Sequence, residues 1–92
     1  MSSLLLLFGS RILEVDMNEK IEHRIGSNIR KLREQAGITQ EYLATKLQLN
    51  GCDITRSAIA KIEVGQRHLY PDEIILIKQI LDVSYDDIFS QI

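Results

Sequence analysis

The stretch IGSNIRKLREQAGITQEYLATKL, residues 25–47, decides the fold because it marks where one helix ends and the next begins. Apolar residues at helical spacing form one stripe that begins just before this stretch and continues through its first half: Ile21, Ile25, Ile29, Leu32 and Ala36. Gly37 then supplies the residue that most readily takes the left-handed conformation at a helix end. Thr39 suits the N-cap of the next helix, with Ile38 and Leu43 as the apolar pair that packs across such a cap. Two helices joined by a tight turn are therefore predicted.

The same signals recur later in the chain. Thr55 and Ser84 are suitable N-caps for two further helices, and Gly65 ends the first of these. Pro71 fits the first turn of a helix between them, because its missing N–H costs nothing there. No alternating apolar run predicts a strand in this part of the chain. The sequence predicts an all-α domain of five helices over residues 17–92.

The first 16 residues have a different pattern. Leu4 to Phe8 is an unbroken apolar run, and Gly9-Ser10 suits a two-residue turn between it and Arg11 to Val15. A hairpin, a disordered arm and a leader upstream of a second start at Met17 all fit. An isolated hairpin is only marginally stable in water, so we expect residues 1–16 to form an irregular or hairpin arm without a function of its own.

Composition excludes several classes of protein. Of the 92 residues, 45% are hydrophobic and 26% charged, which is typical of one globular domain. A single Cys excludes an internal disulfide framework, and the longest apolar run is far below the roughly 20 residues that span a membrane. His23 and His68 are too far apart for a usual zinc site, and no catalytic constellation occurs. We expect a cytoplasmic protein that is not an enzyme, uses no cofactor or metal and does not bind membranes.

Charge is distributed unevenly along the chain, although the net charge is only −2 at pH 7. Residues 20–67 hold nine basic and five acidic side chains, whereas the rest of the chain holds two basic and eight acidic ones. This asymmetry favours a nucleic-acid partner for the basic segment. Chance scatter of charge over a solvated surface is the alternative.

The segment that follows Thr55 has two distinct helical faces. At about 100° per residue, Ile59 and Ile62 fall on one side, together with Ala58. The other side holds Arg56, Ser57, Ala60 and Lys61. A slim basic face of this kind suits the major groove of DNA, although any amphipathic surface helix has a similar pattern.

These motifs resemble the phage-repressor and Cro family of helix-turn-helix proteins, also called the XRE family. The resemblance is carried by residues 25–47, by ITRSAIAKIEVGQR at residues 54–67 and by LDVSYDDIF at residues 81–89. It covers about residues 20–90, and many positions match at the right separations. It implies a five-helix bundle of the lambda-repressor type, with a recognition helix at about residues 55–64 that enters the major groove of duplex DNA.

The resemblance also implies roles for individual residues. Arg33 and Glu63 match a structural ion pair that ties the first helix to the recognition helix. The base-contacting positions are held by Arg56, Ser57 and Lys61. The positions that contact the DNA backbone are held by Thr39, Gln40, Thr55, Gln66 and Arg67.

Two features depart from the family pattern. The turn from Leu49 to Asp53 adds five residues to the usual connection, which leaves open where the recognition helix starts and how it tilts. Val64 replaces a polar residue that often reaches the DNA backbone, so one phosphate contact is expected to be missing.

An apolar surplus near the C-terminus predicts a homodimer. Residues 74–81 are apolar nearly all round, and a single core covers only one face of a helix. Members of the family commonly pair through this region. The expected interface residues are Ile80, Ile88, Phe89 and Ile92.

These observations together predict a sequence-specific transcriptional regulator, expected to be a repressor, that binds double-stranded DNA as a homodimer. One alternative is a protein-interaction module, such as the antitoxin of a toxin–antitoxin pair. Another is a helix-turn-helix subunit of a larger complex that touches DNA only weakly.

Overall fold

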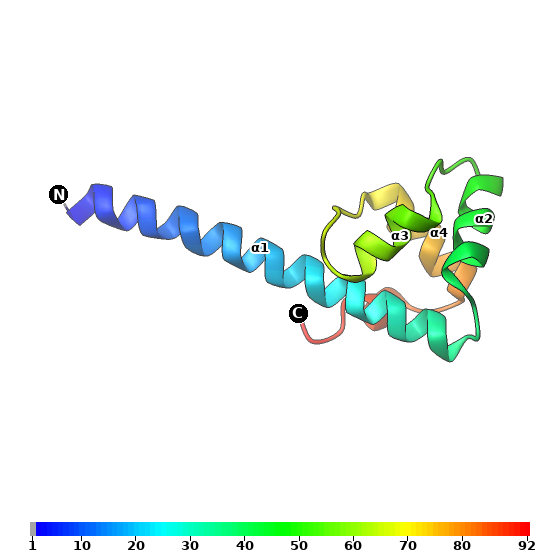
Figure 1. Ribbon diagram of the computed structural model, residues 1–92. Helices are drawn as coiled ribbons and strands as arrows, with labels where there is room; N and C mark the ends of the chain where they lie inside the picture. Colours follow the sequence, from blue (N-terminus) through cyan, green and yellow to red (C-terminus); the bar gives the residue numbers. More distant parts are fainter. Residues whose placement is uncertain (1) are drawn as a thin grey trace.

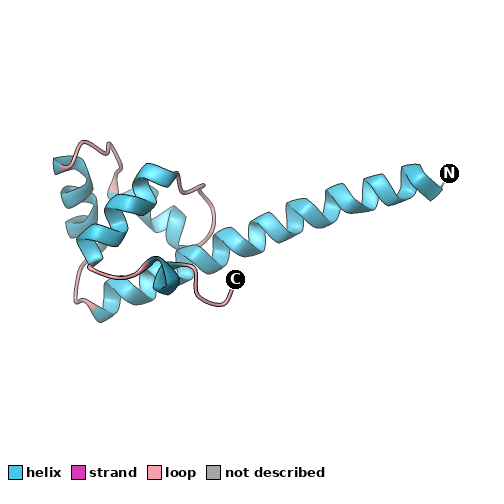
Figure 2. Ribbon diagram, turned by 180° about the vertical axis from the view of Figure 1, so that it is seen from behind, coloured by secondary structure: helices cyan, strands magenta, loops and turns pink. Residues whose placement is uncertain are grey.

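A computed structural model describes the backbone of residues 2–92 and the side chains of residues 19–92. Within this part of the chain the predicted all-α class is confirmed, because it holds five helices and no strand (Figure 2). The helices are α1 (Ser2–Gln35), α2 (Gln40–Leu49), α3 (Arg56–Glu63), α4 (Pro71–Leu81) and α5 (Tyr85–Ile88).

The first helix is much longer than the sequence predicted. α1 begins at Ser2 and continues without a break through the expected domain boundary at residue 17. Figure 1 shows its blue half leading away from the bundle, which makes the molecule 54 Å long but only 24 by 18 Å across. The expectation of an irregular or hairpin arm is therefore wrong for residues 2–16. Gly9-Ser10 does not break the helix, because a glycine inside a helix costs only about 1 kcal/mol relative to alanine.

The core of the bundle draws on α1 to α5 and on the turn between α2 and α3. Its fully buried large side chains are Ile29, Leu43, Leu47, Ile54, Ile59, Ile77 and Ile88. A buried amide adds a polar link across it, since Asn28 on α1 donates to the carbonyl oxygens of Ile88 and Ser90, each at 2.9 Å. These bonds hold the C-terminal segment against α1.

Three helices, α2, α3 and α5, start directly after their predicted capping residues. The Thr39 hydroxyl accepts a hydrogen bond from the Tyr42 N–H at 3.0 Å, and the Thr55 hydroxyl accepts one from the Ala58 N–H at 3.1 Å. Ser84 caps α5 in the same way. Each cap satisfies a backbone donor that has no partner within the helix.

The long turn between α2 and α3 folds back onto α2. The Cys52 N–H donates to the Leu47 carbonyl oxygen at 2.9 Å, and the Gln48 side chain donates to the Ile54 carbonyl oxygen at 2.8 Å. Of the extra residues only Cys52 is buried, and it lies in the core beside the buried Ile54. α3 consequently still begins at Arg56, directly after its predicted cap.

Two glycines at helix ends differ in how close their backbone lies to another part of the chain. Gly65, just beyond α3, and Gly37 both have positive φ, of 76° and 71°. A methyl group at Gly65 would lie 2.9 Å from the His23 Cα, whereas at Gly37 nothing lies within 4 Å. Only Gly65 therefore combines a left-handed backbone with a close contact.

We expect Gly37→Ala to lower the free energy of unfolding by about 1–2 kcal/mol, the cost of a left-handed conformation for a residue with a Cβ. Gly65→Ala should cost about 1–3 kcal/mol more, because α1 and the end of α3 must also move apart. Urea unfolding followed by circular dichroism measures both losses. Equal losses for the two variants would show that the contact with α1 is unimportant.

Candidate nucleic-acid interface

α3 lies with its apolar side on the core and its polar side in solvent. Ile59 and Ile62 are 1% and 2% exposed. Arg56, Ser57 and Lys61 are all exposed, and the half-buried Ala60 lies between them. The three side chains that the resemblance assigns to base contacts thus share one open face of α3. We call these three residues the α3 face.

The start of α2 lies beside the start of α3. A surface hollow is lined by residues from the end of α1, the N-cap and first turn of α2, and the first residue of α3: Arg33, Thr39, Gln40, Glu41 and Arg56. The N-terminus of a ten-residue helix presents backbone N–H groups and a partial positive charge. Two residues assigned to backbone contacts, Thr39 and Gln40, are therefore next to the α3 face.

A buried ion pair joins α1 to the last residue of α3. Arg33 Nε lies 2.7 Å from Glu63 Oε2, and Arg33 Nη2 lies 3.0 Å from Glu63 Oε1. The third guanidinium nitrogen of Arg33, Nη1, donates to the Ile38 carbonyl oxygen at 2.8 Å. The hydrogen bond with Glu63 raises the pKa of Arg33, whereas burial acts in the opposite direction. This is the pair that the resemblance implies, with both side chains almost fully buried.

Gln40 is attached to the same carboxylate. Its Nε2 donates to Glu63 Oε1 at 2.9 Å, so the first residue of α2 is linked to the last residue of α3. A side-chain amide nitrogen carries two hydrogens. The second hydrogen can therefore be donated to a phosphate oxygen while the first keeps its bond to Glu63.

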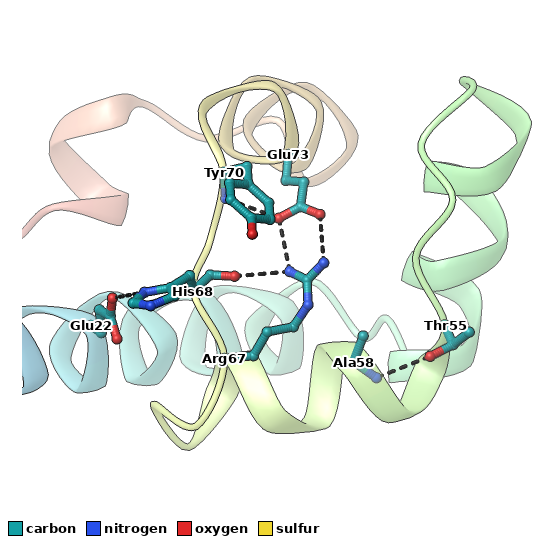
Figure 3. A network of polar contacts seen from close by, with 7 residues as sticks. All are labelled: Glu22, Thr55, Ala58, Arg67, His68, Tyr70 and Glu73. Atoms are coloured by element: carbon teal, nitrogen blue, oxygen red, sulfur yellow. Dashed lines mark hydrogen bonds and ion pairs between the residues drawn. The ribbon is translucent and has the colours of Figure 1, made fainter.

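Arg67 has a different environment from the one expected. Its Nη1 and Nη2 lie 2.9 and 3.0 Å from the two carboxylate oxygens of Glu73, and Nη1 also donates to the His68 carbonyl oxygen (Figure 3). Glu73, which is 5% exposed, accepts a further bond from the Tyr70 N–H. Arg67 thus fastens the loop between α3 and α4 to α4. Its contacts do not support a role at a DNA phosphate.

Glu73 was not among the residues predicted from the sequence. A glutamate at the third position of a helix is a recognisable capping signal, and here it bonds the N–H of Tyr70, the residue before the helix. Its bond to Arg67 depends on the path of the loop, which the capping pattern does not specify. The other expected backbone contact in this loop, Gln66, is exposed.

The expected dimer residues do not share one environment. Ile88 is fully buried in the core of its own chain, so it is not available to a partner, and Ile80 is half-buried against that core. Phe89 and Ile92 are 38% and 59% exposed, and Tyr85 at the start of α5 is also exposed. Helical spacing on a four-residue helix could not tell which of its apolar residues turns inward.

A comparison with protein-family models identifies this architecture. The family model described as HTH_3, Helix-turn-helix, matches residues 29–88, which run from the second half of α1 to the end of α5. The chain belongs to the XRE-type helix-turn-helix family. This XRE-type protein is therefore a DNA-binding regulator of the lambda-repressor and Cro-like type. No curated protein and no solved structure gives a significant match.

Two further features are absent from the described residues. None of their helices has the length and apolar character needed to cross a membrane. Their His, Cys, Asp and Glu side chains form no group that could hold a metal ion.

The Arg67–Glu73 pair predicts how the stability of this XRE-type protein depends on pH. Burial would raise the pKa of Glu73, but hydrogen bonds from Arg67 and the Tyr70 N–H, with the charge of Arg67, lower it overall. A carboxylate whose pKa is lower in the folded state stabilises the fold above its unfolded pKa. That stabilisation is lost as the pH falls through the folded pKa.

We expect the free energy of unfolding to fall as the pH decreases below about 4.5, the ordinary value for Glu. Glu73→Gln should lower stability at neutral pH and flatten this acid decrease, because it removes the titrating group. Asp72→Asn, at the exposed neighbouring position, is the control and should keep the wild-type profile. Urea titrations from neutral pH down to about pH 3 measure the effect. An unchanged acid profile in Glu73→Gln would show that the pair does not stabilise the fold.

Proposed function

We propose that this protein is a sequence-specific transcriptional regulator, acting in the cytoplasm as a repressor, that places α3 in the major groove of duplex DNA. The observation that carries this proposal is the α3 face, which is open to solvent and lies beside the N-terminus of α2. Repression is the simplest consequence of binding, because a domain seated on DNA blocks other proteins from the same site.

Within this proposal Arg56 and Lys61 reach base edges. Arginine and lysine donors match the two acceptors that guanine presents in the major groove. The half-buried Ala60 between them lets the helix approach closely. Ser57 contributes less to specificity, because one hydroxyl can bond to several different bases.

The proposed contacts with the DNA backbone come from the helix caps. The hydroxyl groups of Thr39 and Thr55 each accept a hydrogen bond from a backbone N–H, which leaves their own hydrogens to donate to phosphate oxygens. Gln40 offers its second amide hydrogen, and the exposed Gln66 extends the contacts beyond α3. Each of these groups positions the protein without reading the base sequence.

A homodimer would carry two α3 helices to adjacent half-sites about 34 Å apart, or a multiple of that distance. The exposed apolar side chains of Tyr85, Phe89 and Ile92 support an interface at the C-terminal end. Tyr85 is also held in place by Lys78, whose ammonium group lies 5.2 Å from the centre of its ring. These residues replace the buried Ile88 in the proposed interface.

We expect Arg56→Ala to weaken binding to the preferred duplex by about 1–3 kcal/mol and to relax the preference at one base position. The physical reason is the loss of a bidentate donor that distinguishes guanine from other bases. Duplexes selected from a random pool provide the matched site, and single mismatches in it measure the preference by titration.

Lys31→Ala is the charge-matched control, because it removes one positive charge from an exposed position on α1 and not from the α3 face. It should leave the base preference unchanged. An unaltered preference in Arg56→Ala would show that the wrong face of α3 has been assigned. Failure of the wild-type protein to bind any duplex would favour the protein-interaction alternative, such as an antitoxin.

We expect sedimentation velocity to show a monomer that converts to a dimer as the concentration rises. Phe89→Glu should weaken this association by more than about 1 kcal/mol, because it places a charge in a desolvated interface. Leu49→Glu is the control, since Leu49 is 75% exposed but lies at the end of α2. A concentration-independent monomer, both free and on DNA, would contradict the homodimer.

A further inference from the structure

The loop that follows α3 turns one histidine outward. The His68 side chain is 76% exposed, and its Nδ1 contacts Oε1 of Glu22 on α1 (Figure 3). A carboxylate can only accept a hydrogen bond, so Nδ1 carries the proton in this contact. The other ring nitrogen, Nε2, is on the opposite side of the ring and is left for another partner.

The backbone around His68 is held on both sides. Arg67 Nη1 donates to the His68 carbonyl oxygen while its guanidinium is bonded to Glu73 on α4. On the other side, Gly65 lies directly against His23 of α1. The loop is also joined to α3, since the Gln66 N–H donates to the Lys61 carbonyl oxygen at 2.8 Å. The imidazole therefore occupies a defined place just beyond the C-terminal end of the recognition helix.

A positive charge beyond the end of α3 would favour DNA that lies along this helix. The C-terminal end of a helix carries a partial negative charge, which repels phosphate. Lys61 lies in the last turn of α3, and the next cationic side chain along the chain, Arg67, is turned inward to Glu73. His68 is the next residue, and it is turned outward.

We propose that protonated His68 donates from Nε2 to a DNA phosphate, so that duplex binding by this protein strengthens as the pH falls. The inference rests on the proposed function and adds a proton-dependent contact to it. With His68 protonated, the pair with Glu22 has no net charge. With His68 neutral, the pair carries the charge of Glu22 alone and repels phosphate. Both effects act in the same direction, so binding to DNA takes up a proton.

The elements next to this pair carry other charged groups. Around Glu22, α1 also carries Glu19, Lys20, His23 and Arg24. Near the loop, Lys61 of α3 is exposed, Glu63 is bonded to Arg33, and Glu73 of α4 is bonded to Arg67.

Few of the chain's groups can change charge near neutral pH. Histidine is the side chain that ordinarily does so between about pH 5 and 8, and the chain has two, His23 and His68. Burial raises the pKa of the Cys52 thiol, and the charges of Glu73 and Asp72 act in the same direction. The thiol therefore stays protonated in this range, which leaves the two histidines and a free α-amino terminus as the groups whose charge can change.

The experiment compares binding of the full chain to a labelled mixed-sequence duplex of about 30 base pairs, long enough for two half-sites. Fluorescence anisotropy gives the dissociation constant at about pH 6 and about pH 8, at constant ionic strength. The wild-type protein should bind about two- to fivefold more tightly at the lower pH, the range for one exposed ion pair. At the lower pH, a plot of the logarithm of the binding constant against the logarithm of the salt concentration should be about 0.9 units less steep for His68→Gln than for the wild type.

The variants separate His68 from the rest of the molecule. His68→Gln should bind weakly with the same affinity at both pH values, and His68→Lys should bind tightly at both, because its charge is permanent. His23→Gln is the matched control and should keep the wild-type pH dependence. Circular dichroism at both pH values checks that each variant is folded, which the exposure of His68 favours.

Three results would overturn the inference. The first is wild-type pH dependence retained in His68→Gln, and the second is its disappearance in His23→Gln. The third is wild-type binding that is equally strong at both pH values, which leaves the proposed DNA-binding function intact. Absence of duplex binding at either pH would instead overturn the proposed function together with this contact.

Discussion

The ion pair between Arg33 and Glu63 is the contact on which the arrangement of α1, α2 and α3 depends. One carboxylate, at the last residue of α3, is bonded both to Arg33 on α1 and to Gln40 at the start of α2. Removing one partner of such a buried pair costs about 3–5 kcal/mol, because the other charge is left without compensation. The main effect of the pair is to hold α3 in a fixed orientation relative to α1 and α2. This orientation determines how the opposite face of α3 is exposed to solvent.

Close backbone packing makes this pair possible. A Cβ at Gly26 of α1 would lie 2.0 Å from the carbonyl oxygen of Ile62, so only a glycine lets α1 and α3 approach this closely. A second arginine pair, Arg67 with Glu73, fastens the following loop to α4 in the same manner. Two arginines of the basic segment, Arg33 and Arg67, are thus paired with glutamates of the same chain. The charge count of residues 20–67 consequently overstates how much positive charge these two arginines would offer to DNA.

Local patterns predicted the helix starts and the two faces of α3 because they depend on interactions within about four residues. Thr39, Thr55 and Ser84 cap helices through bonds to the N–H three residues ahead, whatever else the chain does. The first 16 residues show where such patterns are ambiguous. A short apolar run fits a strand or a helix equally well, and Gly9-Ser10 suggested a turn where the backbone is helical.

By itself, the sequence determined the all-α class, the capped helix starts, the position of α3 and the side of α3 that faces solvent. Only the tertiary structure decided that Arg67 turns to Glu73, that Ile88 enters the core while Phe89 stays exposed, and that His68 meets Glu22. Asn28 and Ile88, which are 60 residues apart in the chain, are bonded for the same reason. Such contacts depend on which elements meet after packing, whereas a cap or a helical face is specified within a single turn of the chain.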